Sequence, residues 1–466
     1  METILENRTI DEIQVGETAS LERVLTQQDI QLFASLSGNI NPVHLDEEFA
    51  NANGAHGVIG HSMWGAALIS TLLGTKLPGP GTTYLNQTLA FSNPVRLGDR
   101  LRVQVRASAK DAAAKTVLLD CTATNQDGRE VFSGTALVRA PTEKIRRVAM
   151  RLPNVELHDP YRHYRQLIAL TAGKPAVRTA VVHPTDDVSL GGAIEAARQN
   201  LIIPVLIGPL DKMRAAATAI GEDISGFEII EVPHSHAAAD KAVELARTNN
   251  VQMIMKGSIH TDELMRAIVS REGGMRTARR ISHVFAMDVP EYNKPLFITD
   301  AAINIQPDLA TKVDIVQNAI DFVRIIGIET PKVAILSAVE TVNAAIPSTL
   351  DAAALCKMAD RGQITGGIVD GPLAFDNAIS AEAARIKNMT SPVSGDVDIL
   401  VVPDLESGNM LFKQLVYLAD ALAAGVVLGA KVPIVRTSRA DGELARMASS
   451  ALGMLVANHN ASRTEL

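Results

Sequence analysis

The chain has 466 residues, of which 47% are hydrophobic and 21% charged, and its formal net charge is −8. At roughly 100 to 200 residues per domain, this length predicts two to four folding units with enough apolar material for buried cores. The negative charge and the 3% aromatic content argue against nucleic acid as a partner, because phosphate backbones attract basic surfaces and bases stack on aromatic rings.

The N-terminus is acidic and lacks a basic region followed by an apolar run, so we expect no secretory signal. The longest late apolar stretch, residues 421–430, is too short to cross a bilayer. Cys121 and Cys356 each stand alone in an apolar segment without a metal-ligand partner nearby, which predicts two free thiols and no metal site. We therefore expect a cytoplasmic protein that does not associate with membranes.

Residues 1–145 have an α+β pattern. Thr26 can cap a helix that Gly38 ends, and a nearly all-apolar helix follows over residues 61–76. After a Pro and Gly break, residues 101–106 and 117–123 alternate between apolar and polar side chains, which is typical of half-buried strands. These elements predict one apolar helix wrapped by an antiparallel sheet.

Residues 146–161 mix prolines with basic residues and have no sustained periodicity, which predicts a linker. From residue 162 to 466 apolar runs alternate with helical stretches, the pattern of a parallel sheet with helices on both faces. We expect an α/β domain with two lobes and with strands at 180–182, 204–207, 251–255, 296–299, 333–336, 399–402 and 432–435.

Three segments of the first domain carry a family pattern: residues 33–46 (FASLSGNINPVHLD), 60–63 (GHSM) and 94–99 (PVRLGD). Together they resemble the MaoC-type (R)-specific enoyl-CoA hydratases, and the resemblance implies a hot-dog fold. That family supplies a catalytic pair from an Asp directly after the Gly and a His five residues later. His44 matches the His, the Asp position holds Asn39, and Ser62 is assigned to substrate binding.

An amide has no proton-accepting carboxylate, so Asn39 can position a water molecule but cannot act as its base. Asp46 lies beyond the His rather than at the family position, and the role is not transferred to it. His61 alone fits a helix cap or a core residue. Three interpretations of this domain remain open: an active hydratase, an acyl-CoA-binding domain with little or no hydration, and a dimerisation module that has lost its site.

Five blocks in the second domain recur in order: 256–266 (KGSIHTDELMR), 300–307 (DAAINIQP), 370–379 (DGPLAFDNAI), 403–409 (PDLESGN) and 437–441 (TSRAD). They resemble the phosphate acetyltransferase and phosphate butyryltransferase family. Each block is expected at the carboxyl end of a strand, where open α/β sheets bind ligands. The resemblance implies transfer of an acyl group between coenzyme A and phosphate, with acyl-CoA thioester and phosphate as substrates and no bound cofactor.

By this resemblance, Ser438 and Arg439 match a Ser-Arg pair that stabilises the transition state, and Arg266 matches a substrate-binding Arg. A guanidinium suits this work because it presents a planar fork of donors that stays charged. Position 445, where acetyl-type members have a catalytic Asp, holds Ala, so Asp441 is the nearest replacement as base, with Glu443 behind it.

Further residues of these blocks are assigned to substrate binding: His260, Asn409 and Asp370. Asp370, Asp376, Asp404 and Glu406 could instead order the two lobes, and Asp441 could cap a helix. A dehydrogenase is disfavoured because no GlyxGlyxxGly follows the first strand of this domain. An acyl-CoA sensor without turnover remains a second alternative, and a homo-oligomer is expected.

Overall fold

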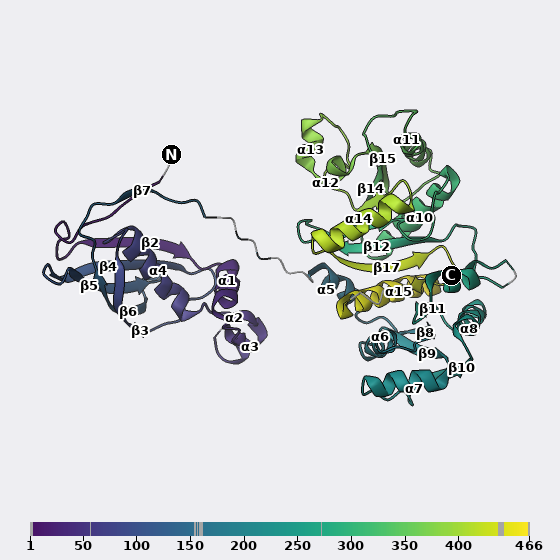
Figure 1. The fold of residues 1–466 in the computed structure, drawn as a ribbon, viewed down its shortest axis with the longest axis horizontal. Coiled ribbons are helices and arrows are strands. Elements are labelled where there is room, and N and C mark those ends of the chain that lie inside the picture. The colour runs from purple at the N-terminus through teal and green to yellow at the C-terminus, as the bar shows by residue number, and fades with distance from the viewer. Residues whose placement is uncertain are drawn as a thin grey trace. The chain divides into compact units, whose positions relative to one another are not determined.

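A computed structural model describes residues 3–464 except 56, 153–154, 156, 158–161, 272 and 437–441. The chain divides into two compact units, Met1–His158 and Asp159–Leu466 (Figure 1). Each unit has buried apolar clusters of its own. None of the described helices has the length and the apolar character needed to cross a bilayer.

The first unit is an antiparallel sheet packed against one long apolar helix. The sheet has the strand order β2-β4-β5-β6-β3, and a separate pair joins β1 to β7. Its helices are α1 Gln27–Ser37, α2 Pro42–Leu45, α3 Glu47–Ala52 and α4 Ser62–Thr75. Its strands are β1 Ile4–Glu6, β2 Thr18–Val24, β3 Thr83–Phe91, β4 Arg100–Asp111, β5 Thr116–Thr124, β6 Glu130–Arg139 and β7 Arg146–Val148.

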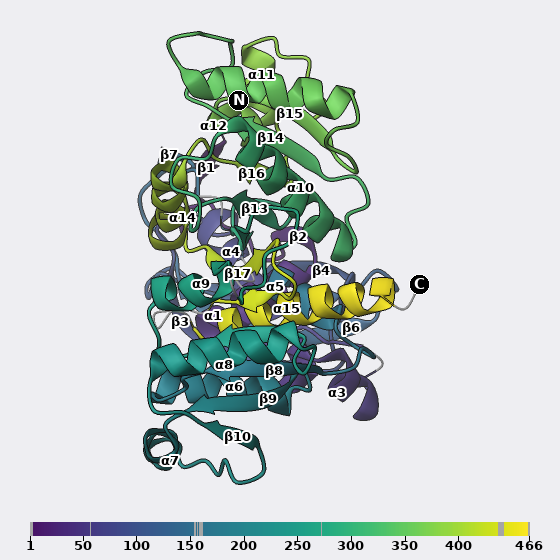
Figure 2. The same ribbon diagram turned by 90° about the vertical axis from the view of Figure 1, so that its right-hand side faces the viewer.

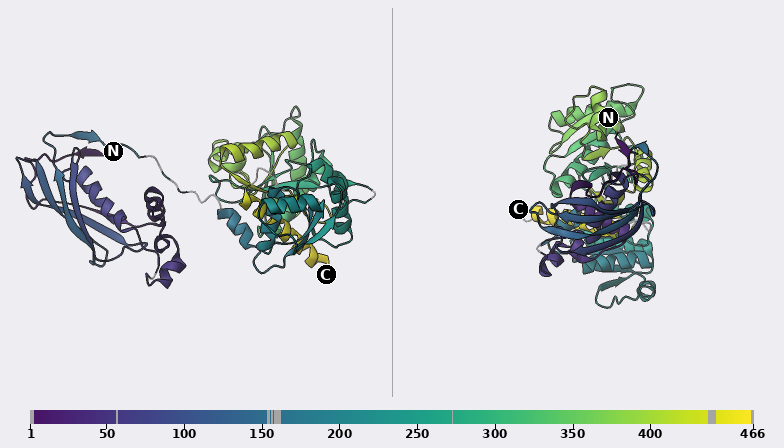
Figure 3. Two further views of the ribbon diagram at one scale, coloured as in Figure 1. Left: turned by 60° about the horizontal axis from the view of Figure 1, so that its bottom comes forward. Right: turned by 90° about the vertical axis from the view of Figure 1, so that its left-hand side faces the viewer.

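The predicted local signals of this unit are confirmed. Thr26 caps α1 by accepting a hydrogen bond from the backbone N–H of Asp29, and Gly38 ends the helix in the left-handed conformation. The alternation in β4 buries Leu101, Val103 and Val105 against α4. Figure 3 shows α4 lying along one face of the curved sheet.

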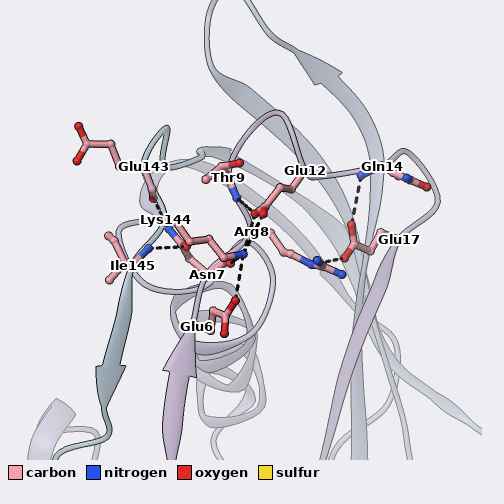
Figure 4. A network of polar contacts seen from close by, with 10 residues as sticks. All are labelled: Glu6, Asn7, Arg8, Thr9, Glu12, Gln14, Glu17, Glu143, Lys144 and Ile145. Atoms are coloured by element: carbon pink, nitrogen blue, oxygen red, sulfur yellow. Dashed lines mark hydrogen bonds and ion pairs between the residues drawn. The ribbon is translucent and has the colours of Figure 1, made fainter.

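A polar network ties the start of the chain to the segment before β7 (Figure 4). The Lys144 ammonium donates to the carbonyl of Asn7 at 2.7 Å and pairs with Glu12 at 2.8 Å. The side chain of Asn7 donates to the carbonyl of Glu143 and accepts from the backbone N–H of Ile145. These contacts join both ends of the first unit.

The second unit is built on one sheet of eleven strands, in the order β10-β9-β8-β11-β18-β17-β12-β13-β16-β14-β15. Its strands are β8 Val177–Val182, β9 Ile202–Gly208, β10 Glu228–Glu231, β11 Met253–Lys256, β12 Ser282–Asp288, β13 Leu296–Thr299, β14 Lys332–Leu336, β15 Ile368–Leu373, β16 Ile399–Val401, β17 Leu422–Leu428 and β18 Ile434–Val435. In Figure 2, β14 and β15 lie toward one end of this unit and β8 and β9 toward the other.

Helices cover both faces of this sheet. One face packs α6, α10 and α15, and the other packs α8, α9 and α14. The helices are α5 Arg162–Ala169, α6 Asp187–Arg198, α7 Leu210–Ala219, α8 Ser235–Arg247, α9 Thr261–Val269, α10 Leu309–Ile325, α11 Pro347–Asp360, α12 Phe375–Ile379, α13 Ala381–Ile386, α14 Leu405–Leu418 and α15 Glu443–Thr464.

The expected all-parallel sheet is wrong in its centre. β17 pairs antiparallel with both β18 and β12, and β12 also pairs antiparallel with β13. Three reversals therefore separate β18 from β13, so β13 and β16 run opposite to β11 and β18. As a result, the carboxyl ends of the strands in the two lobes point to opposite edges of the sheet.

Both cysteines are free thiols. Burial raises the pKa of Cys121 to about 11 and that of Cys356 to about 12, so both stay protonated at neutral pH. Cys121 is buried, whereas Cys356 is only half-buried, which corrects the expectation that both lie in the core.

Candidate functional site

The first unit brings Asn39, His44 and His61 together, and we call these three residues the N-terminal cluster. The rings of His44 and His61 lie with their centroids 3.8 Å apart. Nε2 of His61 is 3.0 Å from the backbone carbonyl oxygen of Asn39. The predicted pair His44 and Asn39 is thus connected through His61, which the sequence suggested only as a cap or a core residue.

His44 is held in one tautomer by its surroundings. It lies in α2, is 8% exposed, and has Nδ1 2.9 Å from the carbonyl oxygen of Ile59. A carbonyl oxygen only accepts, so this nitrogen carries the hydrogen and Nε2 keeps the lone pair of the neutral ring. Burial lowers the pKa of His44 below its usual range, and the neighbouring His61 lowers it further. His44 therefore offers one proton acceptor at neutral pH.

His61 occupies the N-cap position of α4 but makes no capping hydrogen bond with its side chain. Its ring is 3% exposed, and Nδ1 has no hydrogen-bond partner among the described residues. Nε2 donates to the Asn39 carbonyl, so Nδ1 is a second buried lone pair beside His44. The signal available in the sequence was its place in the 60–63 segment at the start of a buried helix.

The remaining predicted residues of this unit are exposed. Asn39 is exposed, and its side-chain oxygen accepts the backbone N–H of Asn41 at 3.2 Å. Ser62 is exposed in the first turn of α4, next to His61. Asp46 caps α3 by accepting from the backbone N–H of Phe49, which gives it a structural task and agrees with leaving it out of the catalytic pair.

In the second unit, the blocks at 256–266, 300–307 and 403–409 begin at or just after the ends of β11, β13 and β16, as predicted. The block at 370–379 does not, because Asp370 lies inside β15 and its carboxylate accepts the backbone N–H of Gly371. Since the strands of the two lobes run in opposite directions, these blocks leave the sheet at opposite edges.

Helix α9 brings residues of one edge toward the other. His260 is the exposed N-cap residue of α9, and its backbone N–H donates to Glu263 at 3.3 Å. Arg266 is exposed in the last turn of the same helix and makes no ion pair within the described part of the chain. The 300–305 loop packs Ile303 against the apolar cluster that contains α9. Arg266 and the 300–305 loop therefore belong to the same region of the fold.

Asp300 organises that loop. Its carboxylate accepts the backbone N–H groups of Ala302, Ile303 and Asn304 at 3.0 to 3.1 Å. Burial raises the pKa of Asp300, and these hydrogen bonds oppose that shift. Next to it, the side-chain amide of Asn409 lies 3.5 Å from the carbonyl oxygen of Ala301. Asn409 is thus positioned at the loop by the first turns of α14.

Three acidic residues of the blocks have positions that fit an ordering role. Asp404 caps α14 by accepting from the backbone N–H of Ser407 at 2.8 Å. Asp376 is exposed and pairs with Lys387 at 3.4 Å, and Glu406 is exposed in the first turn of α14. The described residues contain no group of three His, Cys, Asp or Glu side chains that could hold a metal ion.

His283 is a buried group that the sequence did not single out. It lies on β12, is fully buried, and has no hydrogen-bond partner for either ring nitrogen among the described residues. Burial lowers its pKa to about 3, and the positive charge of Arg436 lowers it further. The ring contacts Phe285, which stacks on Phe412 of α14. A neutral imidazole therefore lies beneath α14, near the residue that precedes the 437–441 block.

Ser438, Arg439 and Asp441, the predicted catalytic residues of this unit, lie outside the described residues. The described chain reaches them from Arg436 after β18 and continues at Gly442 before α15. The side chain of Glu443, at the start of α15, is also outside the description.

Comparison with known proteins assigns both units. The family described as "Phosphate acetyl/butaryl transferase" matches residues 235–452, and the family "MaoC like domain" matches residues 11–127. A phosphate acetyltransferase of Rhizobium meliloti is 61% identical over 298 residues, covering 64% of this chain and 94% of that protein. A phosphate butyryltransferase of Clostridium acetobutylicum is 41% identical over 296 residues, covering 64% and 98%.

A solved structure agrees with the fold of the second unit. The crystal structure of a branched-chain phosphotransacylase from Enterococcus faecalis V583 has a TM-score of 0.53 at 29% identity and covers 60% of this chain and 99% of its own. Both resemblances inferred from the motifs are confirmed, as is the predicted order of a hot-dog domain before a two-lobed α/β domain. The chain therefore belongs to the phosphate acetyl/butyryl transferase family and carries a MaoC-like domain ahead of the transferase part.

Proposed function

We propose that residues 162–466 catalyse the reaction of an acyl-CoA, with an acetyl or butyryl group, with inorganic phosphate to give acyl phosphate and coenzyme A. The observation that carries this proposal is the 61% identity to a phosphate acetyltransferase over 94% of that protein. The grouping of Arg266, the 300–305 loop and Asn409 supports it, because phosphate needs cations and amides around it.

In the forward direction a phosphate oxygen attacks the thioester carbonyl carbon. The carbonyl oxygen gains negative charge, the carbon–sulfur bond then breaks, and coenzyme A leaves as a thiolate that takes up a proton. Arg439 and Ser438 stabilise the charge on the oxygen, and Arg266 binds the phosphate. Asp441 gives a proton to the departing thiolate and removes it from the thiol in reverse. We propose that these steps need no bound cofactor.

The test is release of free thiol from a panel of acyl-CoAs with two to six carbons, with and without phosphate. Phosphate-dependent release with acetyl-CoA or butyryl-CoA is expected. Absence of release with every member of the panel would remove the proposal and favour an acyl-CoA-binding protein without turnover.

For residues 1–145 we propose binding of an enoyl-CoA with slow hydration. The neutral His44, with the lone pair of Nε2 available, supports a role in proton transfer. The exposed amide of Asn39 supplies no second carboxylate base. Hydration of crotonyl-CoA to the (R) product, followed at its thioester absorbance, tests this. We further propose that residues 146–161 link the two parts and that the enzyme works in the cytoplasm as a homo-oligomer.

A further inference from the structure

A pocket of about 410 Å³ lies in the second unit beside the end of α9. Four arginines line it, Arg271, Arg276, Arg279 and Arg280, together with a single acidic residue, Asp314. We call it the arginine pocket. Its lining carries an excess of positive charge in a chain whose net charge is negative.

Two of the four guanidinium groups are already engaged by the protein. Arg276 donates to the carbonyl of Val269 at 2.6 Å, and Arg279 pairs with Asp321 at 2.5 Å. Arg271 and Arg280 make no ion pair and no side-chain hydrogen bond with the described residues, and both are exposed.

Asp314 does not neutralise the two uncommitted arginines through an ion pair. Its carboxylate accepts the backbone N–H of Arg280 at 2.9 Å, and no ion pair joins it to a guanidinium within the described residues. Like charges gathered around one pocket repel one another, and a bound polyanion relieves that repulsion. The lining therefore suits a ligand with more than one negative group.

The pocket adjoins the residues proposed to bind substrate. Val269, which lines it, lies one helical turn after Arg266 on α9. Ile303 and Asn304 also line it and belong to the loop whose Ala301 carbonyl lies beside Asn409. An extended substrate can thus run from the pocket past Arg266 and the 300–305 loop.

The pocket is also set apart from the proposed point of acyl transfer. Arg276 forms a bridge with Ala430, and the Thr277 hydroxyl donates to the carbonyl of Gly429, so the pocket lies by the turn between β17 and β18. Arg436, the last described residue before the 437–441 block, follows the other end of β18. Six residues join Ala430 to Arg436, a span of at most roughly 22 Å.

We propose that the arginine pocket binds the phosphate groups at the nucleotide end of coenzyme A. This inference rests on the proposed acyl transfer. Coenzyme A carries a diphosphate and a 3′-phosphate, and a long pantetheine arm separates them from the reacting thiol. Arg271 and Arg280 meet these phosphates with bidentate, charge-assisted hydrogen bonds. Inorganic phosphate attacks the acyl carbon and must lie beside it, so it does not explain a pocket at a distance.

The kinetic test compares two acyl donors in the full chain, acetyl-CoA and acetyl-pantetheine, which lacks the nucleotide. In the double variant Arg271→Ala/Arg280→Ala, kcat/KM for acetyl-CoA should fall by about 10- to 100-fold from the lost charged hydrogen bonds. The value for acetyl-pantetheine should stay unchanged. Arg214→Ala, an exposed arginine on α7 that does not line the pocket, is the matched control and should change neither.

A second measurement does not depend on turnover. Adenosine 3′,5′-bisphosphate should bind the wild type, compete with coenzyme A and bind the double variant at least about 10-fold more weakly by calorimetry. Equal losses with both acyl donors, an effect confined to the KM of inorganic phosphate, or unchanged binding of the bisphosphate would each overturn the inference. If the wild type turns over no acyl-CoA, the proposed transfer fails, while the binding measurement still decides what the pocket holds.

Discussion

The N-terminal unit gathers Asn39, His44 and His61 from one loop and the helix start that follows it, whereas the second unit collects its candidate residues from the ends of strands far apart in sequence. In the first case the neighbours along the chain set most of the geometry. In the second, Arg266 and Asn409 are related only through helix α9, the 300–305 loop and the directions of the strands beneath them. The comparison teaches that a compact motif can keep its shape while losing one chemical group, and that a dispersed site depends on the whole sheet.

The largest effect is expected from Arg439→Ala, which tests whether the dispersed site is the chain's acyl transferase. Loss of one donor to a developing anion should lower phosphate-dependent thiol release by about 100- to 1000-fold. Crotonyl-CoA hydration should not change, because it belongs to the other unit. The control is again Arg214→Ala, and a nearly normal rate in Arg439→Ala would take this residue out of the mechanism.

The next effect concerns the compact N-terminal cluster. Asn39→Asp restores a carboxylate at almost the same volume and should raise hydration of crotonyl-CoA by at least about 10-fold if the rest of the site is intact. Asn51→Asp, an exposed and equally charged change on α3, should have no effect. The rate is measured in both variants and in the wild type.

Two results would contradict that interpretation of Asn39. Rapid hydration by the wild type that His44→Ala abolishes would show that Asn39 is sufficient. No hydration in either the wild type or Asn39→Asp would favour a structural module and leave the transferase as the only enzyme of the chain.

A smaller effect tests how α14 holds Asn409 in place. A Cβ on Gly408 would lie 2.6 Å from the Val402 side chain and 2.9 Å from Ala301, so Gly408→Ala should push the helix away from the 300–305 loop. We expect a loss of about 1 to 2 kcal/mol in unfolding free energy, with overpacking outweighing the better helix propensity of Ala. Gly191→Ala on α6, where only Ile220 comes near at 3.7 Å, should not destabilise. Thermal unfolding of both variants measures the difference.

The smallest effect is expected from the pH dependence of His283. Its pKa in the folded chain is about 3, so the unfolded chain binds one more proton as the pH falls below 6.5. Stability from this group is present above about pH 6.5 and declines toward the folded pKa, at up to about 1.4 kcal/mol per pH unit. The non-titrating His283→Gln should lose less stability than the wild type between about pH 7.5 and about pH 5 in thermal unfolding. An identical loss in both proteins would contradict the assignment.

Local signals in the sequence were enough for much of the first unit. A capping Thr26, a terminating Gly38 and alternation in β4 act over a few residues, so pattern alone identified them. The motifs also identified both families, and four of the five transferase blocks follow strands as the pattern indicated. Asp370 did not, because an apolar strand can continue through a carboxylate that its own backbone satisfies.

Other features were decided only by the tertiary structure. The Ala- and Gly-rich stretch that forms β17 has low strand propensity, and an apolar run signals burial without giving the direction of a strand. The reversals at β17 and β12, the contact of His61 with His44, the burial of His283 and the gathering of four arginines around one pocket all arise from pairings between distant segments. Sequence periodicity records which side chains are apolar, whereas hydrogen bonding between strands and packing of helices determine which of them meet.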